Sequence, residues 1–418
     1  MEKTILIISA LNIWSMGKDK GAQSLWVTLR SYADEGYKVY FVTSSKGITG
    51  KLYDNIEIIR FSLEWVKKWL SLRKISFFAR IVFYILFQVI SLKLALNICK
   101  KGKIIAVYAY EIAGVPVCKI LSKILKIPII SRFQGTSITP YIHAFLWKLR
   151  FFEHMIAYKI PVDLLIMADD GTQGDKVLNS LNINMEKVKF WMNGVDKNMY
   201  VADFDRDSFN KELSLDSKTK ILLTVSRLVK WKRVDRIIRA MPYIISQSKE
   251  IVLMIVGDGE ERENLTELAH KLNIIPYIFF VGAIPHEKVK TYMNAADIFV
   301  SLYELSNVGN PLLEAMICSK CIVTIDEGDT FKVVKNMETG ILLNENEIET
   351  LPETIINLLN NEDLGLRLGK NAREYALNYF WSWEERMEKE MRTVIQVIEK
   401  KKSIQKSTLC RGYNSALL

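Results

Sequence analysis

The sequence predicts an α/β protein built from two doubly wound domains that face each other across a cleft. Three observations lead to this prediction. The chain has 418 residues, which is too long for one ordinary core and fits two domains of about 200 residues each. Short, fully apolar runs alternate with helix-like stretches, as in parallel sheets that helices cover on both faces. This alternation occurs twice, once in each half of the chain.

Nine apolar runs are predicted to form the strands. Those of the first half are Thr4–Ser9, Val39–Thr43, Ile104–Tyr108 and Ile127–Arg132. Those of the second half are Ile221–Ser226, Ile251–Gly257, Ile278–Val281, Ile298–Leu302 and Cys321–Ile325. In such sheets ligands bind at the carboxyl ends of the strands, so we expect the binding site in the cleft between the domains.

The two series of strands divide the chain into three parts. We predict an N-terminal domain over residues 1–196, a C-terminal domain over residues 197–385, and a C-terminal helix over residues 386–418 that could cross back to the first domain. The segment from Lys400 to Leu418 is basic and then rich in small polar residues, which is typical of a poorly ordered tail.

The charge of the chain favours an anionic partner. The net charge is +10, which suits phosphates, nucleic acid or an acidic membrane surface. No nucleic-acid motif accompanies this charge, so no nucleic-acid partner is expected. The first residues indicate a buried strand rather than a signal peptide, so we expect a cytoplasmic protein. The lone pair Cys318 and Cys321 is interpreted as core packing rather than half of a metal or redox site.

The stretch from Trp65 to Lys103 combines nine Lys or Arg residues with many bulky apolar ones. Its longest uncharged run, Ile81–Leu92, has twelve residues. A membrane-spanning helix needs about 20, so we predict no span. Two interpretations stay open: a helix that lies in an anionic membrane surface, or a buried helix whose lysines reach out to water.

The segment from Ser306 to Glu314 has the features of an anion site. It follows an apolar strand, and Asn310 and Pro311 are typical of an N-cap and a first helical residue. The free amides and the dipole of a helix start attract anions, and Gly309 would let a ligand approach the backbone. Glu314 would then lie in the first turn, where a carboxylate can accept hydrogen bonds from two neighbouring hydroxyls. The alternative is an ordinary connection with a capping Asn.

Two cations follow the strand Ile221–Ser226. Arg227 and Lys232 lie just past its carboxyl end, where ligands bind. An Arg fork and a mobile Lys charge suit a diphosphate. A solvated basic loop would be the interpretation if this segment stood alone.

Three further loops could face the same cleft. Val256–Arg262 looks like a dinucleotide loop, but Arg262 stands where the third glycine belongs, so a nicotinamide enzyme is not favoured. Gly17–Gly21 follows the first strand and could touch phosphates. Ser131–Thr136 ends another strand. Either of these two could equally be a plain connection.

From Val188 to about Phe380 the sequence resembles the family 4 retaining glycosyltransferases, which have the GT-B fold of two facing Rossmann-like domains. The matching blocks occur in the order of that family: Asn193-Gly-Val-Asp196, Ser226-Arg-Leu228 with Lys232, Val256-Gly-Asp-Gly259, Phe280-Val-Gly282, Ala295-Ala-Asp297, Pro311-Leu-Leu-Glu-Ala-Met316 and Thr339-Gly-Ile-Leu342. Residues before Val188 match only loosely.

The resemblance implies roles for individual residues. Arg227 and Lys232 would hold the donor diphosphate, and Glu314 would bind the ribose; these three are the implied catalytic residues. Further donor contacts are implied for Gly21, Gln134, Asn193, Asp258, Gly259, Ile284, Ser306, Asn307, Val308, Gly309 and Asn310.

Two positions differ from the family pattern. The family has two glutamates separated by seven residues, and the first position here holds Ser306, with Glu304 or Asn307 as neighbouring substitutes. The family often has a His where this chain has Gln134, and Gln cannot take a proton at neutral pH. Both differences concern the donor sugar and the catalytic detail, and neither removes the phosphate site.

The resemblance implies an enzyme that moves a sugar, with retention, from a UDP-sugar or GDP-sugar to a glycan or lipid-linked acceptor in surface polysaccharide, lipopolysaccharide or other lipid-linked glycan assembly. No cofactor or metal is expected, because two cations already neutralise the diphosphate. The enzyme would work in the cytoplasm, peripherally at the inner face of the membrane. A sugar-nucleotide epimerase of the same fold and a non-catalytic binding subunit are the alternatives.

Overall fold

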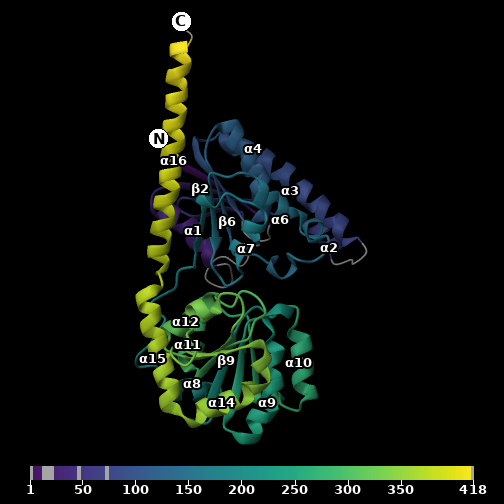
Figure 1. Ribbon diagram of the computed structural model, residues 1–418, viewed down its shortest axis with the longest axis vertical. Helices are drawn as coiled ribbons and strands as arrows, with labels where there is room; N and C mark the ends of the chain where they lie inside the picture. Colours follow the sequence, from purple (N-terminus) through teal and green to yellow (C-terminus); the bar gives the residue numbers. More distant parts are fainter. Residues whose placement is uncertain (1–2, 12–22, 45–48, 71–74, 416–418) are drawn as a thin grey trace.

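The computed structural model describes residues 3–11, 23–44, 49–70 and 75–415, which form two α/β domains stacked along the long axis of the molecule (Figure 1). Each domain contains one sheet, and the two sheets have eight and six strands. The structure therefore confirms the predicted fold class. The helix α16 (Trp383–Ser415) leaves the C-terminal domain and runs along the side of the N-terminal domain.

The N-terminal sheet has the order β3-β4-β2-β1-β5-β6-β7-β8, and all neighbours are parallel except β3 and β4. Its strands are β1 (Thr4–Ser9), β2 (Lys38–Thr43), β3 (Gly50–Tyr53), β4 (Ile56–Arg60), β5 (Ile104–Tyr110), β6 (Ile129–Phe133), β7 (Leu164–Ala168) and β8 (Val188–Trp191). The helices of this domain are α1 (Gln23–Asp34), α2 (Glu64–Leu70), α3 (Ser76–Cys99), α4 (Val115–Leu125), α5 (Trp147–Arg150), α6 (Phe152–Lys159) and α7 (Gly174–Ser180), with short 3₁₀ turns at Ile112–Gly114, Thr139–Tyr141 and Met185–Lys187.

The C-terminal sheet has the order β11-β10-β9-β12-β13-β14 and is parallel throughout. Its strands are β9 (Lys220–Val225), β10 (Ile251–Val256), β11 (Ile278–Gly282), β12 (Ile298–Ser301), β13 (Cys321–Ile325) and β14 (Ile341–Leu343). Its helices are α8 (Arg206–Glu212), α9 (Val234–Gln247), α10 (Arg262–Lys271), α11 (His286–Ala295), α12 (Asn310–Ile317), α13 (Thr330–Val333), α14 (Leu351–Asn360) and α15 (Glu362–Tyr379), with 3₁₀ turns at Lys230–Lys232, Ile275–Tyr277 and Glu345–Thr350.

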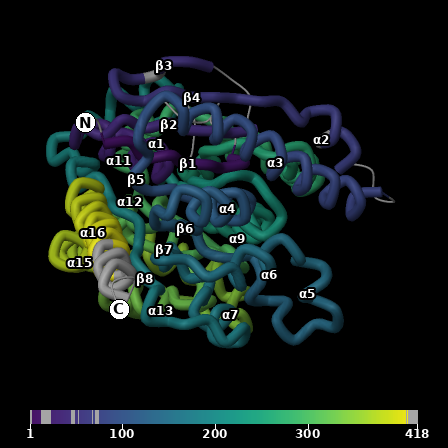
Figure 2. The backbone as a smooth tube through the Cα atoms, turned by 90° about the horizontal axis from the view of Figure 1, so that it is seen from above, coloured from purple at the N-terminus to yellow at the C-terminus, as the bar shows by residue number. Residues whose placement is uncertain are grey.

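Each sheet is covered on both faces. In the N-terminal domain, α3, α4 and α6 pack on one face, and α1 packs on the other together with α16. Met387, Val394 and Ile398 of α16 are buried in that second core. Seen from above, α16 lies on the side of the molecule opposite to α2 and α5 (Figure 2). A late segment of the chain therefore completes the core of the first domain.

One expectation about the helices needs correction, and one finding bears on the predicted absence of a membrane span. The segment after Lys400, expected to lack regular structure, continues α16 as far as Ser415. The run Ile81–Leu92 belongs to the 24-residue helix α3, which by length and composition alone is apolar enough to cross a membrane. A helix can be apolar over more residues than its longest uncharged run, because an isolated charge does not interrupt it.

Candidate active site

The loops after β9 and β10 pack directly on each other. A Cβ atom added to Gly257 would lie 1.8 Å from the carbonyl oxygen of Ser226, and one added to Gly259 would lie 2.2 Å from that of Leu228. The amide of Leu228 donates to the carbonyl of Asp258 at 3.0 Å, and the Asp258 side chain accepts from the Gly259 amide at 2.8 Å. The glycines are required here because they let one loop support the other.

Lys232 and Arg227 lie close together at the carboxyl end of β9. The ammonium nitrogen of Lys232 lies 3.8 Å from the ring centre of Tyr303 and donates to the carbonyl of Ser306 at 3.2 Å. Burial lowers the pKa of Lys232 to about 7, with Asp170 opposing the shift and Arg227 adding to it. An anion bound between the two cations would stabilise the charged form of Lys232. It would offset both the cost of burying this charge and its repulsion from Arg227.

The helix α12 begins one residue earlier than expected. Gly309 is its N-cap and Asn310 its first residue, so Glu314 lies beyond the first turn rather than within it. The Glu314 side chain is almost fully buried, and its Oε1 lies 2.8 Å from Nε2 of His286. This hydrogen bond raises the pKa of His286. The result is a buried carboxylate held in a fixed position by His286.

Several predicted donor contacts have structural partners of their own. The side chain of Asn307 donates a hydrogen bond to the carbonyl of Tyr303 at 2.7 Å. It also accepts a hydrogen bond from the Tyr303 amide at 3.1 Å. The amide of Val308 donates to the carbonyl of Asp170 at 3.0 Å. Ile284 packs against the core of the C-terminal domain. These contacts shape the cleft wall and hold the loop before α12.

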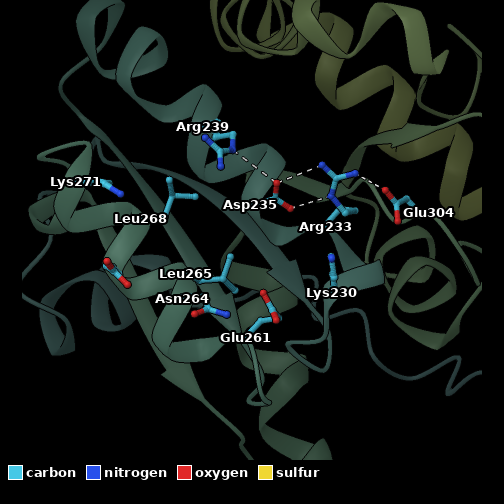
Figure 3. Close-up of a pocket in the computed structure, with 11 residues that line it drawn as sticks. Lys230, Arg233, Asp235, Arg239, Glu261, Asn264, Leu265, Leu268, Lys271 and Glu304 are labelled. Carbon is cyan, nitrogen blue, oxygen red and sulfur yellow. Dashed lines mark hydrogen bonds and ion pairs between the residues drawn. The ribbon is translucent and has the colours of Figure 1, made fainter. Parts of the chain in front are cut away.

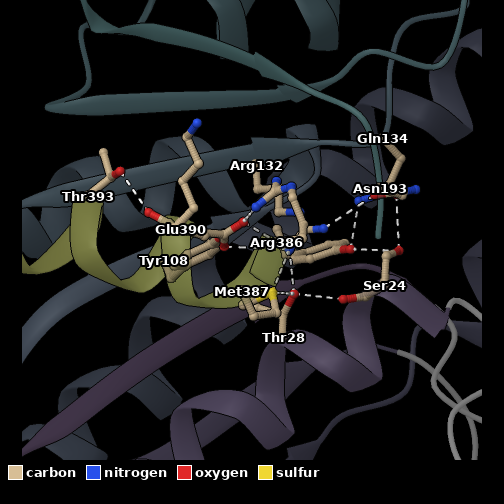
Figure 4. Close-up of polar contacts among 12 residues, drawn as sticks. Ser24, Thr28, Tyr108, Arg132, Gln134, Asn193, Arg386, Met387, Glu390 and Thr393 are labelled. Carbon is tan, nitrogen blue, oxygen red and sulfur yellow. Dashed lines mark hydrogen bonds and ion pairs between the residues drawn. The ribbon is translucent and has the colours of Figure 1, made fainter. Parts of the chain in front are cut away.

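Polar side chains from both domains meet across the cleft. Gln134 accepts hydrogen bonds from Ser24 at 3.0 Å and Asn193 at 3.4 Å, and it donates to the Tyr110 hydroxyl at 2.7 Å (Figure 4). Asn193 also donates to the side chain of Asn310 at 3.1 Å. The structure thus brings three of the predicted residues together. Gly21 lies outside the described residues.

A buried ion cluster lies behind these amides. Arg132 of β6 and Arg386 of α16 both pair with Glu390 of α16, and the phenol of Tyr108 donates to the same carboxylate (Figure 4). Arg132 also lies 3.5 Å from the Asn193 side-chain oxygen. This cluster was not predicted from the sequence, although Arg132 within a buried strand was a usable signal.

Two carboxyl groups of the N-terminal domain near these amides, the half-buried Glu111 and the buried Asp170, were not predicted. Glu111, which follows β5, accepts the amide of Gln134 at 2.8 Å, and burial raises the pKa of Glu111 to about 7. Asp170, which follows β7, accepts a hydrogen bond from the hydroxyl of Ser306 at 2.6 Å. Neither stands in a recognisable motif, so only the fold brings them to the site.

A separate pocket of about 550 Å³ lies on the surface of the C-terminal domain between α9 and α10 (Figure 3). Its charged groups pair with one another: Arg233 bonds to both Asp235 and Glu304. In this structure the Glu304 side chain therefore has an ion-pair partner in this pocket.

The cysteine pair and the acidic groups give no sign of a metal centre in the part of the chain that the structure describes. Cys318 and Cys321 are both buried and free. Within residues 3–11, 23–44, 49–70 and 75–415, no group of three or more His, Cys, Asp or Glu side chains is placed to hold a metal ion.

Two facing Rossmann-like domains with parallel sheets are the arrangement of the GT-B fold. Residues 205–375, which lie in the C-terminal domain, match the family Glycosyl transferases group 1. Among solved structures, that of Anabaena Alr3699/HepE in complex with UDP and glucose is similar with a TM-score of 0.68 and 17% identity, over 97% of this chain and 99% of the other.

Two curated relatives extend this result. An uncharacterized glycosyltransferase of Methanocaldococcus jannaschii is 37% identical over 177 residues, which cover 41% of this chain and 45% of the relative. The N-acetyl-alpha-D-glucosaminyl L-malate synthase of Bacillus anthracis is 23% identical over 84% of this chain and 88% of its own length. The chain thus spans about half of the first relative and most of the second.

Proposed function

We propose that this protein is a retaining glycosyltransferase that moves a hexose from a UDP-sugar or GDP-sugar to an acceptor hydroxyl. The observation that carries the proposal is the arrangement of Arg227, Lys232 and Glu314 at one edge of the C-terminal sheet. Two cations there suit a diphosphate, and a fixed carboxylate suits the paired hydroxyls of a ribose. The family match of the C-terminal domain and the UDP complex of a similar fold support the same donor class.

In the transition state, positive charge develops on the sugar and negative charge on the leaving diphosphate. Arg227, Lys232 and the start of α12 stabilise the leaving charge, as preorganised donors do. The loss of one such group costs roughly 2.7–4 kcal/mol. The leaving phosphate accepts the proton of the acceptor hydroxyl, so no carboxylate nucleophile is required.

We further propose a lipid-linked acceptor at the inner face of a membrane, in surface-glycan assembly. The support is an apolar and basic surface over Trp65–Lys103, where Trp65, Phe78 and Val89 are exposed. Exposed aromatic and aliphatic residues among lysines suit the boundary of an anionic membrane. The enzyme would then meet its nucleotide sugar from the cytoplasm.

The test is a transfer assay with UDP-glucose, UDP-N-acetylglucosamine and GDP-mannose as donors, and with product analysis. The variants Arg227→Ala and Glu314→Ala are expected to lower kcat/KM by roughly 100-fold or more. Arg239→Ala, on the outer pocket of the same domain, is the matched control and should leave transfer unchanged. Full activity in both site variants would refute the assignment, and donor conversion without an acceptor would indicate an epimerase.

A further inference from the structure

Asp170 connects the two domains at the cleft. Its Oδ2 accepts a hydrogen bond from the Ser306 hydroxyl at 2.6 Å, across 136 residues of sequence. Its Oδ1 accepts from the hydroxyl of Thr172 at 2.6 Å and from the Thr172 amide at 3.3 Å. Its carbonyl accepts the Val308 amide at 3.0 Å. The side chain thus comes from the first domain but is bonded to the loop that precedes α12.

The carboxylate of Asp170 is buried, and its neighbours only partly offset the free-energy cost of burying its charge. Burial raises the pKa of Asp170, while the bonds from Ser306 and Thr172 and the charge of Lys232 oppose the shift. The donors to this carboxylate are two hydroxyls and one amide, so its charge is balanced by dipoles and by a neighbouring cation. A buried carboxylate of this kind gains from further hydroxyl donors.

The surrounding backbone is shaped to admit this carboxylate. Gly135 has φ +88°, and a Cβ atom added there would lie 2.3 Å from the Asp170 Oδ1. Ser306 has φ +58°, a left-handed conformation that is uncommon for a residue with a side chain. This conformation directs the Ser306 hydroxyl toward Asp170, and the Ser306 carbonyl accepts the hydrogen bond from Lys232.

Other polar groups near position 306 are already occupied. Glu304 pairs with Arg233 in the outer pocket (Figure 3). Asn307 bonds the backbone of Tyr303 through both its side-chain atoms. Glu314 bonds His286. Asp170 is thus the carboxylate that lies against Ser306, beside the Lys232 charge.

We propose that Asp170, together with Ser306, accepts hydrogen bonds from the hydroxyls of the donor sugar and so determines which sugar is used. This inference rests on the proposed function. A donor bound through its diphosphate to Arg227 and Lys232 would place its sugar at the loop before α12, where Asp170 enters from the opposite domain. Sugar recognition then depends on contact between the domains, whereas nucleotide recognition resides in the C-terminal domain alone.

The test separates binding of the sugar from binding of the nucleotide. Calorimetry is performed on Asp170→Asn with UDP-glucose, UDP-N-acetylglucosamine and GDP-mannose, and in parallel with UDP and GDP. We expect affinity for the nucleotide sugar that binds the wild type best to fall about tenfold, and affinity for its bare nucleotide to change less than about threefold. Retained nucleotide binding also shows that the variant is folded. Asp169→Asn, the adjacent carboxylate, is the matched control.

Deoxygenated donors identify a direct contact. If Asp170 accepts a sugar hydroxyl, removal of that hydroxyl abolishes the difference between wild type and Asp170→Asn, while donors lacking other hydroxyls preserve it. An equal loss for every deoxy donor, or no loss for the parent donor, would overturn the inference. The proposed function fails by a different result, namely a wild type that binds nucleotide sugars but transfers nothing.

Discussion

Arg132 Nη1 lies 3.2 Å from Glu390 Oε2, and the two side chains are 1% and 0% exposed. The pair joins β6 of the N-terminal domain to α16, and Arg386 bonds the same carboxylate at 2.8 Å. Two guanidinium groups therefore share one buried carboxylate. Removal of the carboxylate leaves both cations without a charged partner, which is more costly than loss of the pair as a whole.

The variant Glu390→Gln is expected to lower the free energy of unfolding by about 3–5 kcal/mol, because it leaves buried charge unpaired. Denaturant titration measures this change. Glu388→Gln is the control, since Glu388 is exposed on the same helix and pairs with the exposed Arg392. Equal stability of both variants would contradict the prediction.

The same cluster makes the stability of the N-terminal domain depend on pH in the acidic range. Burial alone would raise the pKa of Glu390, but Arg132 and Arg386 outweigh it and lower the pKa. A group whose pKa is lower in the folded state adds stability above its unfolded pKa, about 4.3 for Glu, and loses that contribution as the pH falls. The free energy of unfolding should be measured at intervals of about one pH unit between about pH 3 and 7. Toward acidic pH it should fall less in Glu390→Gln than in the wild type.

Lys232 should couple nucleotide binding to proton uptake. Its pKa is about 7 in the unliganded protein, and a bound diphosphate would raise it. Above pH 7 the affinity for UDP or GDP should therefore fall by up to about tenfold per pH unit. Calorimetry in buffers of different ionisation enthalpy measures the uptake directly. Lys232→Arg, which stays charged, should bind without uptake, whereas Lys271→Arg on the outer pocket should behave as wild type.

Gly328 is expected to control the approach of the two domains. It has φ +62°, and a Cβ atom added there would lie 2.0 Å from the carbonyl oxygen of Gly171 in the N-terminal domain. Gly328→Ala should therefore hold the cleft more open and lower kcat/KM by about tenfold or more, with little change in nucleotide affinity. Small-angle scattering and kinetics check this. Gly365→Ala, where the nearest atom is 3.9 Å away, is the control.

The exposed face of α3 should mediate attachment to anionic vesicles. Phe78, Ile85 and Val89 are 68%, 56% and 60% exposed, and their spacing places them on one side of the helix. Their joint replacement by Glu should reduce flotation with phosphatidylglycerol vesicles about tenfold or more. Leu366→Glu, at an exposed position of α15, should float as wild type does. Unchanged flotation of the triple variant would show that α3 does not mediate attachment to the vesicles.

The central strands could be predicted because their sequences are fully apolar. Thr4–Ser9 and Cys321–Ile325 are the observed bounds of β1 and β13, and the bounds of the other predicted strands differ from the observed ones by one or two residues. Several strands at or near the sheet edges were missed for physical reasons, although the edge strand β11 was predicted. β4 carries Glu57 and Arg60 because it lies beside the edge strand β3 and is only partly buried, and β14 has only three residues, too few to show a pattern. β7 is apolar and was predictable from the same rule.

The C-terminal half of the site was predictable because its residues stand in consecutive motifs. Arg227 and Lys232 lie in one loop, and Glu314 follows a recognisable helix start. The N-terminal half was not predictable, since Asp170 and Ser306 meet only after both domains fold. Arg132 and Glu390 are 258 residues apart and meet for the same reason.

The packing of α16 sets the order of events when the chain is synthesised. Strands β1 to β8 emerge from the ribosome early, but one face of their sheet is covered by Met387, Val394 and Ile398, which follow every strand of both sheets. At about 5–20 residues per second, roughly 10–40 seconds separate β8 from these residues. During that interval the part of this apolar face that α1 does not cover stays exposed, so the first domain is the one that chaperones should engage. The C-terminal domain needs no such delay, and we expect it to reach its folded form first.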